Sequence, residues 1–444
     1  MPSTTSYSTS IHLIIKKNNA KMANLSPLGA QLAALPSFRN MLESVTADAY
    51  SESNSNGFIN LGAAENFLML DTISNYANRH LATTANDFSY GSGPWGSPKL
   101  RHLMARHINK RFHPVIQVQP SELLFANGCT SLCEMLGFTI ASPDEGILLS
   151  RPIYQAFQID FGTKARVKCI YTSFAGSNQF APAAAEDYER TLDEAETQGT
   201  KIRALLLCHP HNPLGQSYPQ ETIKAIMQLC QRRRIHLIMD EIYALSVYPN
   251  PDDADAVPFT SSLAFDSSAY ISPERLHLLY GFSKDFAAGG LRLGCLYTRN
   301  RELMAALSAC TQFHWSGAGN ERIAEAILED EEFLDGFFEA SARGLGERNR
   351  LVRGLLDEKG VRYHRGANAG FFLWVDFRPY LDVTGKEGVE AEEALAKRFM
   401  DNKVSLTPGL SMSAEEPGWF RIVFTRSEEE MRLAMKRLFD ACGI

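Results

Sequence analysis

The chain has 444 residues, of which 45% are apolar and 21% charged, so it is long enough to bury one large core or two ordinary ones. Its net charge is -7 and the sequence contains no basic cluster, so we expect that the protein does not bind nucleic acids. Its eight cysteines form no CxxC pair, so we expect no metal site and a cytoplasmic protein with reduced thiols. No apolar run is long enough to span a bilayer, so we expect no membrane partner.

The first 24 residues are rich in serine and threonine and contain lysines but no acids. They weakly resemble a transit peptide, but they lack the arginines of one, so we predict a disordered extension. Met22 is then an alternative start of the chain.

Between residues 120 and 300, short apolar runs alternate with longer stretches, which is typical of a parallel sheet with helices on both faces. Residues 131–141 and 221–234 repeat apolar side chains at intervals of three and four and are predicted helices. The predicted strands are 146–150, 166–172, 202–210, 234–243, 275–283 and 291–298.

After residue 300 the pattern changes to a long amphipathic run at 331–359, a short strand in GFFLWVDF and a final helix at 427–441. The fold class is therefore α/β. We predict a large domain at 86–310, a small α+β domain at 311–444, and an N-terminal segment at 25–85 that packs on the small domain.

Polar side chains follow three of the predicted strands. Asn212 comes after ALLLC, Asp240 and Tyr243 come after HLIM, and Lys284 comes after LHLLY, with Arg292 in the same turn. Because the carboxyl ends of parallel strands meet at one edge of a sheet, we expect these side chains to lie together around a ligand.

The chemistry of this set points to one cofactor. An acid at the end of a buried strand needs a cation or a protonated donor, and Asp240 can hold a pyridinium nitrogen protonated. Asn212 and Tyr243 can donate to a phenolate oxygen of the same ring, and a desolvated Lys284 is a Schiff-base candidate. These roles indicate pyridoxal phosphate.

A phosphate also needs a binding site. The stretch NGCTSLCEM places Gly128, Cys129 and Thr130 at the predicted start of a helix, where backbone N–H groups and the helix dipole attract an anion. Arg292 adds a permanent positive charge.

Each feature alone also has an ordinary structural interpretation. Asp240 and Thr130 are common helix-capping residues, NPLG is a common turn, and Cys129 with Cys133 fits helix packing. Their joint occurrence, in this order and after these strands, favours the cofactor site.

With these motifs in view, the chain from about residue 58 onward resembles fold-type I pyridoxal-phosphate enzymes of the class I/II aminotransferase family. The resemblance rests on NPLG, DEIY and GFSKDFAAGGLRLG. It implies that Lys284 bonds the cofactor, Asp240 pairs with its ring nitrogen, Asn212 and Tyr243 bind its ring oxygen, and Arg292 binds its phosphate. It also implies that Tyr154, in RPIYQAF, stacks on the ring, and that the protein is a homodimer with shared active sites.

Within that family the chain resembles 1-aminocyclopropane-1-carboxylate synthases and their relatives, including proteins of fungal specialised metabolism. NLGAAEN matches a substrate-side motif of that subgroup and places Glu65 at its glutamate. EPGWFRIVF places Arg421 as the clamp for the α-carboxylate of an amino acid, a group that suits a bidentate arginine. NAGFFLWVD is a third similar stretch.

Two departures from that pattern affect the expected reaction. The family's phosphate-binding serine is replaced by Gly281, with Ser283 as a candidate substitute. In SYGSGPWGSPKLR, Pro94 stands where the synthase has a tyrosine that reaches the partner's site, and the nearest tyrosine, Tyr90, is displaced by four residues. The second change disfavours cyclopropane formation.

We therefore expect a pyridoxal-phosphate enzyme that acts on an α-amino acid by transamination or carbon–sulfur cleavage, in specialised metabolism. One alternative is a 1-aminocyclopropane-1-carboxylate synthase that uses S-adenosylmethionine. A remote alternative is a catalytically silent binding homologue.

Overall fold

The computed structural model describes residues 24–34, 43, 45–174, 176–250, 252–253, 256–382, 384 and 387–444. Almost all of the predicted N-terminal extension, with Met22, lies outside the described residues. Contacts divide the chain into two units, residues 1–58 and residues 59–444. The first unit contains α2 (Pro27–Ala33), which begins after Ser26, whose hydroxyl accepts from the Gly29 N–H at 3.1 Å.

The second unit contains a seven-stranded sheet in the order β2-β8-β7-β6-β5-β3-β4. Strands β3 to β7 run parallel to one another, whereas β8 is antiparallel to both β7 and β2. The predicted mostly parallel sheet is confirmed, and all six predicted strands are present, one with the predicted bounds and five shorter. The strands are β2 (Leu123–Ala126), β3 (Gly146–Ser150), β4 (Lys168–Thr172), β5 (Ile202–Cys208), β6 (His236–Asp240), β7 (Leu276–Gly281) and β8 (Gly294–Thr298).

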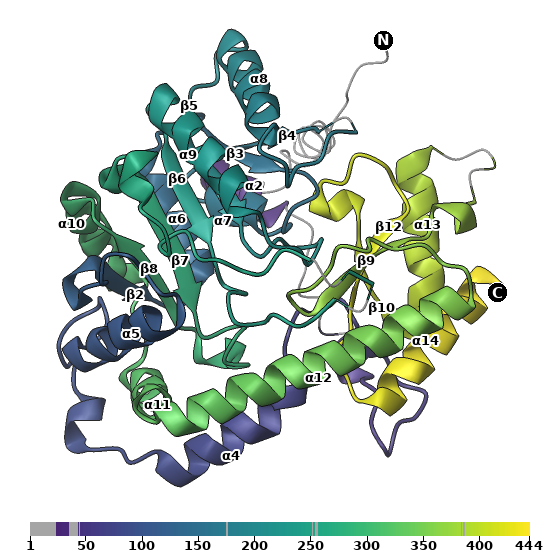
Figure 1. Cartoon of the computed structure of the whole chain (residues 1–444). Coiled ribbons are helices and arrows are strands. Elements are labelled where there is room, and N and C mark those ends of the chain that lie inside the picture. Colours follow the sequence, from purple (N-terminus) through teal and green to yellow (C-terminus); the bar gives the residue numbers. More distant parts are fainter. Residues whose placement is uncertain are drawn as a thin grey trace. The chain divides into compact units, whose positions relative to one another are not determined.

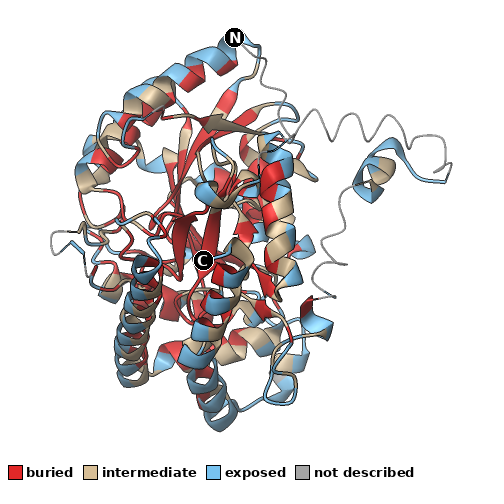
Figure 2. Ribbon diagram, turned by 90° about the vertical axis from the view of Figure 1, so that its right-hand side faces the viewer, coloured by how far each residue is buried: buried red, intermediate tan, exposed pale blue. Residues whose placement is uncertain are grey.

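The central strands are buried on both faces, which explains their continuous apolar sequences. Along β5, Leu205 and Leu207 join a core with helices α8 and α9, whereas Leu206 joins a second core with helices α6, α7 and α10. Figure 2 shows the resulting buried sheet between helices whose outer faces are exposed. The helices are α6 (Cys129–Ile140), α7 (Phe157–Gly162), α8 (Ala184–Thr197), α9 (Gln220–Arg233) and α10 (Arg301–Cys310).

A second, three-stranded antiparallel sheet has the order β11-β12-β9, and β1 pairs with β10 in a separate parallel ladder. On one face of the sheet, Phe420 packs edge-on against Phe399 of α13, with ring centroids 5.3 Å apart. Arg421 and Trp419 alternate with Phe420 along β12, so Arg421 lies on the other face. The strands are β1 (Ile59–Asn60), β9 (Phe372–Asp376), β10 (Val404–Ser405), β11 (Thr407–Pro408) and β12 (Trp419–Val423).

The long helix α12 (Glu331–Glu358) runs from α11 to α14 past both sheets (Figure 1). It coincides with the predicted amphipathic run at 331–359. The final helix, α14 (Glu428–Cys442), begins after Ser427, which forms a capping box with Glu430. The remaining helices are α4 (Leu70–His80), α5 (Pro98–Arg111), α11 (Ala318–Glu329) and α13 (Gly388–Asp401). The predicted domain boundaries stay predictions.

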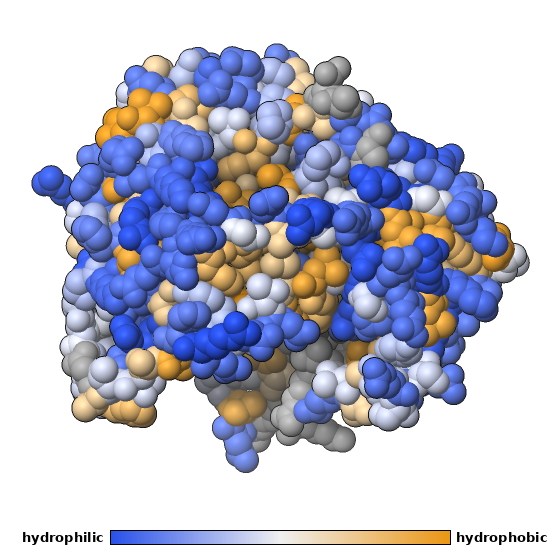
Figure 3. Space-filling model, turned by 60° about the horizontal axis from the view of Figure 1, so that its bottom comes forward, coloured by the Kyte–Doolittle hydropathy of each residue, from blue (hydrophilic) through white to orange (hydrophobic). Residues whose placement is uncertain are grey.

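Apolar groups also reach the surface, in several patches among hydrophilic side chains on the face shown in Figure 3. Phe88, Tyr90 and Phe313 are the most exposed large apolar or aromatic side chains, at 83%, 86% and 77%. Within the described part of the chain, none of the helices combines the length and apolarity that a membrane crossing requires.

Candidate active site

Three predicted site residues follow strands that are direct neighbours in the seven-stranded sheet. Asp240 is the last residue of β6, and its backbone pairs with Cys208 of β5 and Leu279 of β7. Asn212 lies four residues past the end of β5, and Lys284 lies three residues past the end of β7. The sheet therefore brings these side chains to one edge.

The Lys284 side chain is half-buried at this edge. Its Nζ donates to the carbonyl of Ala64 at 2.5 Å and lies 5.9 Å from the ring centroid of Tyr243. Burial, followed by the charge of Arg421, lowers the pKa of Lys284 to about 8. About a tenth of the amine is therefore neutral and nucleophilic at pH 7, and the fraction rises with pH.

The Asp240 carboxyl is buried, with 6% of the residue exposed. It accepts one backbone hydrogen bond, from Ile242 at 3.3 Å, and burial raises its pKa to about 7. A buried acid with this pKa gains stability when a cationic or protonated donor binds beside it.

Arg421 comes from the three-stranded sheet, and only 2% of it is exposed. Its guanidinium donates to Asn212 Oδ1 at 2.9 Å, to the Gly62 carbonyl at 2.6 Å and to the Thr407 hydroxyl at 3.2 Å. Its buried Nε has no hydrogen-bond partner among the described residues. Burial lowers the pKa of Arg421 below its usual range. The site thus holds a buried guanidinium with no carboxylate among these partners.

Two tyrosines line the same region. Tyr243 is buried, and its ring packs edge-on against Phe371 and Phe372 at 5.3 and 5.4 Å. Tyr154 is half-buried, packs edge-on against Phe157 at 5.3 Å, and has a pKa raised to about 12 by burial. Burial also raises the pKa of Tyr243, so both phenols are protonated and can donate hydrogen bonds.

The predicted phosphate-binding residues also come together. Helix α6 begins at Cys129, after Gly128 at φ 114°, and a Cβ added to Gly128 would lie 2.5 Å from the Arg292 guanidinium. Glycine at this position therefore lets the arginine approach the helix N-terminus. Thr130 is exposed in the first turn, and the Cys129 thiol donates to the Tyr280 carbonyl at 3.3 Å.

The replacement of serine by Gly281 has a structural counterpart. Gly281 pairs with Gly294 of β8, and a Cβ at 281 would lie 2.6 Å from the Leu293 carbonyl. This close approach leaves no space for a side chain at 281. Ser283, the candidate substitute, is half-buried.

Glu65 lies at the periphery of the cluster, whereas the ring contact of Tyr90 lies outside it. Glu65 is exposed; its carbonyl accepts from the Thr425 hydroxyl, and a Cβ on Gly289 would lie 3.9 Å from its Oε1. Tyr90 contacts Trp315 with ring centroids 5.7 Å apart, and its high exposure leaves the side chain open to a partner.

Two acids near the site were not assigned from the sequence. Asp285 accepts from the Leu245 N–H at 2.9 Å, the Ser246 hydroxyl at 2.6 Å and the Tyr280 hydroxyl at 3.0 Å, which ties the lysine turn to the segment after β6. Asp160, on α7, is 6% exposed, and burial raises its pKa to about 7. Asp285 stands next to Lys284 in the quoted motif, whereas no pattern in the sequence distinguishes Asp160.

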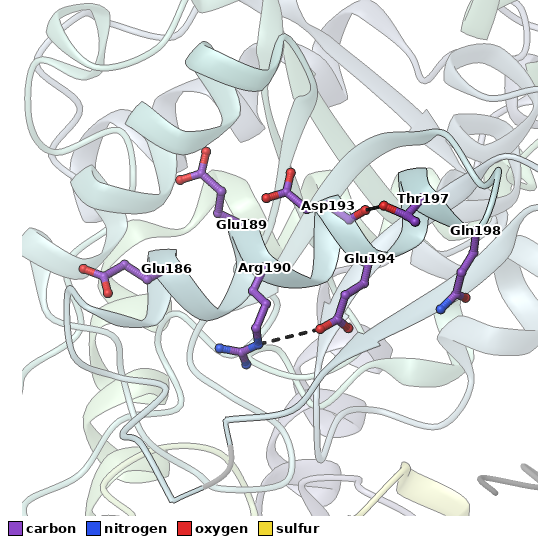
Figure 4. A pocket seen from close by; sticks show the side chains of 7 residues that line it. All are labelled: Glu186, Glu189, Arg190, Asp193, Glu194, Thr197 and Gln198. Atoms are coloured by element: carbon purple, nitrogen blue, oxygen red, sulfur yellow. Dashed lines mark hydrogen bonds and ion pairs between the residues drawn. The ribbon is translucent and has the colours of Figure 1, made fainter.

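A surface hollow of about 630 Å³ lies elsewhere, along the outer face of α8 (Figure 4). Its side chains are mostly acidic, and they include Asp193, which pairs with Arg233 of α9 at 2.6 Å. Such paired surface charges have a structural role. Among the described residues, no three His, Cys, Asp or Glu side chains gather as a metal site would require.

The residues present fit pyridoxal phosphate. Asp240 is a buried acid with no ion pair among the described residues, Gly128 lets the Arg292 guanidinium reach the N-terminus of α6, and Lys284 has a lowered pKa. The α/β fold and this site therefore define a pyridoxal-phosphate-dependent enzyme of fold type I.

The chain belongs to the family of class I and II aminotransferases, whose model matches residues 57–438. It is 30% identical over 400 residues to a human protein named probable inactive 1-aminocyclopropane-1-carboxylate synthase-like protein 2, covering 88% of this chain and 68% of that protein. It is also 30% identical to 1-aminocyclopropane-1-carboxylate synthase 2 of Solanum lycopersicum, covering 88% and 81%.

Solved structures show the same fold. A double mutant of Thermus thermophilus aspartate aminotransferase superposes with a TM-score of 0.71 at 22% identity, covering 86% of this chain and 91% of that one. The predicted fold, cofactor and subgroup resemblance are confirmed by these comparisons. The predicted kinship with fungal specialised metabolism has no support in them and stays a prediction.

Proposed function

We propose that the protein acts on an α-amino acid through a covalent bond between Lys284 and pyridoxal phosphate, by transamination or carbon–sulfur cleavage in specialised metabolism. One observation carries the proposal. The Lys284 amine and the Arg421 guanidinium donate to the carbonyls of Ala64 and Gly62, two residues apart in one segment. The two groups that would hold the cofactor and the substrate carboxylate therefore converge on one short stretch of chain.

The other predicted residues have roles toward the cofactor in this proposal. Asp240 would hold the proton on the ring nitrogen, Asn212 and Tyr243 would donate to the ring oxygen, and Tyr154 would cover the ring. The N-terminus of α6 (Gly128, Cys129 and Thr130), Ser283 and Arg292 would hold the phosphate. When bound, the cofactor supplies an electron-accepting ring to which the amine of an amino acid can be joined.

The chain's own groups would then bind the substrate and move a proton. The unpaired Nε of Arg421 and the rest of its guanidinium suit the α-carboxylate, the group that fixes the orientation of an amino acid. The amine of Lys284, with its pKa of about 8, suits removal of the Cα proton near neutral pH. Glu65 lies within electrostatic range of Lys284, where its charge favours the protonated amine.

We propose a homodimer in which Tyr90 reaches the partner's site. The exposed side chains of Phe88, Tyr90 and Phe313 support an interface on this part of the molecule, because large exposed apolar groups mark association surfaces. Equilibrium sedimentation tests it, and a monomer at micromolar concentration would contradict it.

Two alternatives are kept because relatives favour them. The tomato relative named as a 1-aminocyclopropane-1-carboxylate synthase favours that reaction with S-adenosylmethionine, although Pro94 replaces the expected tyrosine. The human relative named as probably inactive favours a silent homologue. The presence of Lys284, Asp240 and Arg421 together weighs against a catalytically silent protein.

Product analysis separates these functions. Purified protein is incubated with cofactor and, in turn, with amino acids plus a 2-oxo acid, with cysteine conjugates, and with S-adenosylmethionine. Transfer of the amino group or release of a thiol supports the proposal, and a cyclopropane amino acid supports the synthase. A visible absorption band that Lys284→Ala abolishes is the control for cofactor attachment, and a colourless wild-type protein would support the silent alternative.

A further inference from the structure

A second pocket, of about 260 Å³, lies between the segments that follow β3 and β4 and the three-stranded sheet. It is lined by Arg151, Phe174, Gln179, Trp374, Glu415 and Trp419, among others. It is separate from the α8 hollow, and its walls come from the same two parts of the chain that supply Tyr154 and Arg421.

The wall on the three-stranded sheet is aromatic. Trp374 and Trp419 stack with ring centroids 5.9 Å apart and planes 4° from parallel. The guanidinium of Arg378 covers Trp419 at 4.9 Å from the ring centroid, which helps to hold the stack in place. The two stacked indoles line the pocket with aromatic, apolar surface, which suits contact with another flat ring.

The opposite wall includes Gln179 and Arg151. Gln179 is only 7% exposed, and its Oε1 has no hydrogen-bond partner among the described residues. The Nε of Arg151 is likewise buried without a partner in the described part of the chain. Unpaired buried polar atoms are costly, so a rotation of these side chains toward a ligand that donates to Gln179 and accepts from Arg151 would recover that cost.

The lining carries charges of both signs. Glu416 pairs with Arg378. Glu415 accepts a hydrogen bond from the Ser173 hydroxyl and keeps its negative charge, and Arg151 adds a positive charge on the opposite wall. This arrangement favours a ring with both donors and acceptors over a simple cation or a simple anion.

The pocket is adjacent to the proposed carboxylate clamp. Trp374 is the cross-strand partner of Arg421, and Trp419 lies two residues before it on the same strand. All three side chains therefore share one face of the sheet, with neighbouring Cβ atoms about 5 to 7 Å apart. Phe372 continues this face inward, since the Arg421 guanidinium lies 5.3 Å from its ring centroid.

We propose that this pocket binds the far end of the substrate side chain, and that this end is a planar ring bearing hydrogen-bond donors and acceptors. The proposal rests on the proposed function, because it takes Arg421 as the group that binds the α-carboxylate. The volume is below that of typical drug-sized pockets of about 300 to 1,000 Å³, so it admits one ring system and excludes larger conjugates.

The four tryptophans of the chain provide a direct test. The cofactor-bound protein is labelled with 5-fluorotryptophan, and its fluorine signals are assigned by single Trp→Phe substitutions. It is then titrated with adenine and with benzamide, two planar probes that lack an α-carboxylate. We expect at least one probe to shift the signals of Trp374 and Trp419, while those of Trp95 and Trp315 stay in place.

Gln179→Leu should weaken binding of that probe about tenfold, because it removes one hydrogen bond to a buried group. Gln198→Leu, the same change on the outer face of α8, is the matched control and should have no effect. Cyclohexanecarboxamide, which is not planar, should bind at least tenfold more weakly. If neither planar probe shifts Trp374 and Trp419 at millimolar concentration, or if Gln179→Leu binds as well as the wild type, the proposal is wrong.

This test does not depend on turnover. Repeated on Lys284→Ala protein, the titration should give the same shifts, although that variant cannot carry out the proposed reaction. If the probes shift the signals but the wild-type protein converts no amino acid, the pocket proposal stands and the proposed function is wrong. If the protein converts an amino acid but the signals do not shift, the proposed function stands and the pocket proposal is wrong.

Discussion

Arg421 donates a hydrogen bond to Oδ1 of Asn212 at 2.9 Å, although the two residues lie 209 positions apart in the chain. The bond occupies the amide oxygen of Asn212 and leaves its NH₂ group to donate elsewhere. The proposed carboxylate clamp therefore also fixes the orientation of the residue that would donate to the cofactor's ring oxygen. A change at Arg421 should act on both.

Arg421→Lys should lower kcat/KM for the amino acid substrate by on the order of 100-fold, because a lysine cannot bind Asn212 and a carboxylate with one planar fork. Steady-state kinetics measure this change. Arg432→Lys, on the exposed face of α14, is the matched control. Unchanged kcat/KM in Arg421→Lys would show that the carboxylate binds elsewhere.

The attachment of pyridoxal phosphate to the cofactor-free protein should depend on pH. Because burial lowers the pKa of Lys284 to about 8, the neutral amine and the rate should rise with pH, reach half-maximum near pH 8, and then level. Stopped-flow absorbance measures the rate. Arg421→Met removes the second-largest cause of the shift, so the midpoint should move to higher pH; a midpoint that stays in place would contradict the assignment.

Gly281→Ser, which restores the residue usual in the family, should destabilise the protein by about 1 to 3 kcal/mol, as overpacking of tight backbone contacts does. The added Cβ would lie 2.6 Å from the Leu293 carbonyl and 3.0 Å from the Gly294 Cα. Urea unfolding measures the loss. Gly290→Ser is the control, since a Cβ there meets nothing within 4 Å. Equal stability of Gly281→Ser and the wild type would show that β7 and β8 separate readily.

Asp160→Asn should stabilise the cofactor-free protein at high pH. The folded-state pKa of Asp160 is raised from 3.8 to about 7, so the folded protein holds an extra proton between these values and loses stability as pH rises through them. Asparagine does not titrate, so the variant's advantage should grow from near zero at pH 4 to on the order of 2 kcal/mol at pH 8.

Urea unfolding of both proteins across this range gives the difference in free energy. The buried histidines, whose pKa values are lowered, are common to both proteins and cancel. Asp71→Asn, on the exposed side of α4, controls for the exchange of a carboxyl for an amide. If the stability advantage of Asp160→Asn instead shrinks as the pH rises, the pKa of Asp160 is not raised in the folded protein.

The sequence by itself determined the large sheet and much of the site. Strands such as GILLS are continuous apolar runs because both faces are covered, and local composition alone reveals them. β2 was missed because its four residues, Leu123–Ala126, are too few to distinguish from a buried helical turn. The sequence could predict that Asn212, Asp240 and Lys284 lie at one edge of the sheet because parallel strands place their carboxyl ends together.

Only the tertiary structure decided the contacts between distant segments. No pattern in the sequence pairs Arg421 with Asn212, brings the Ala64 carbonyl to Lys284, or buries Asp160, because each depends on how separate elements pack. The same holds for Gly281, whose missing side chain is explained by the close approach of Leu293. Local sequence sets which strands and helices form, whereas long-range packing sets the partners and pKa values of their side chains.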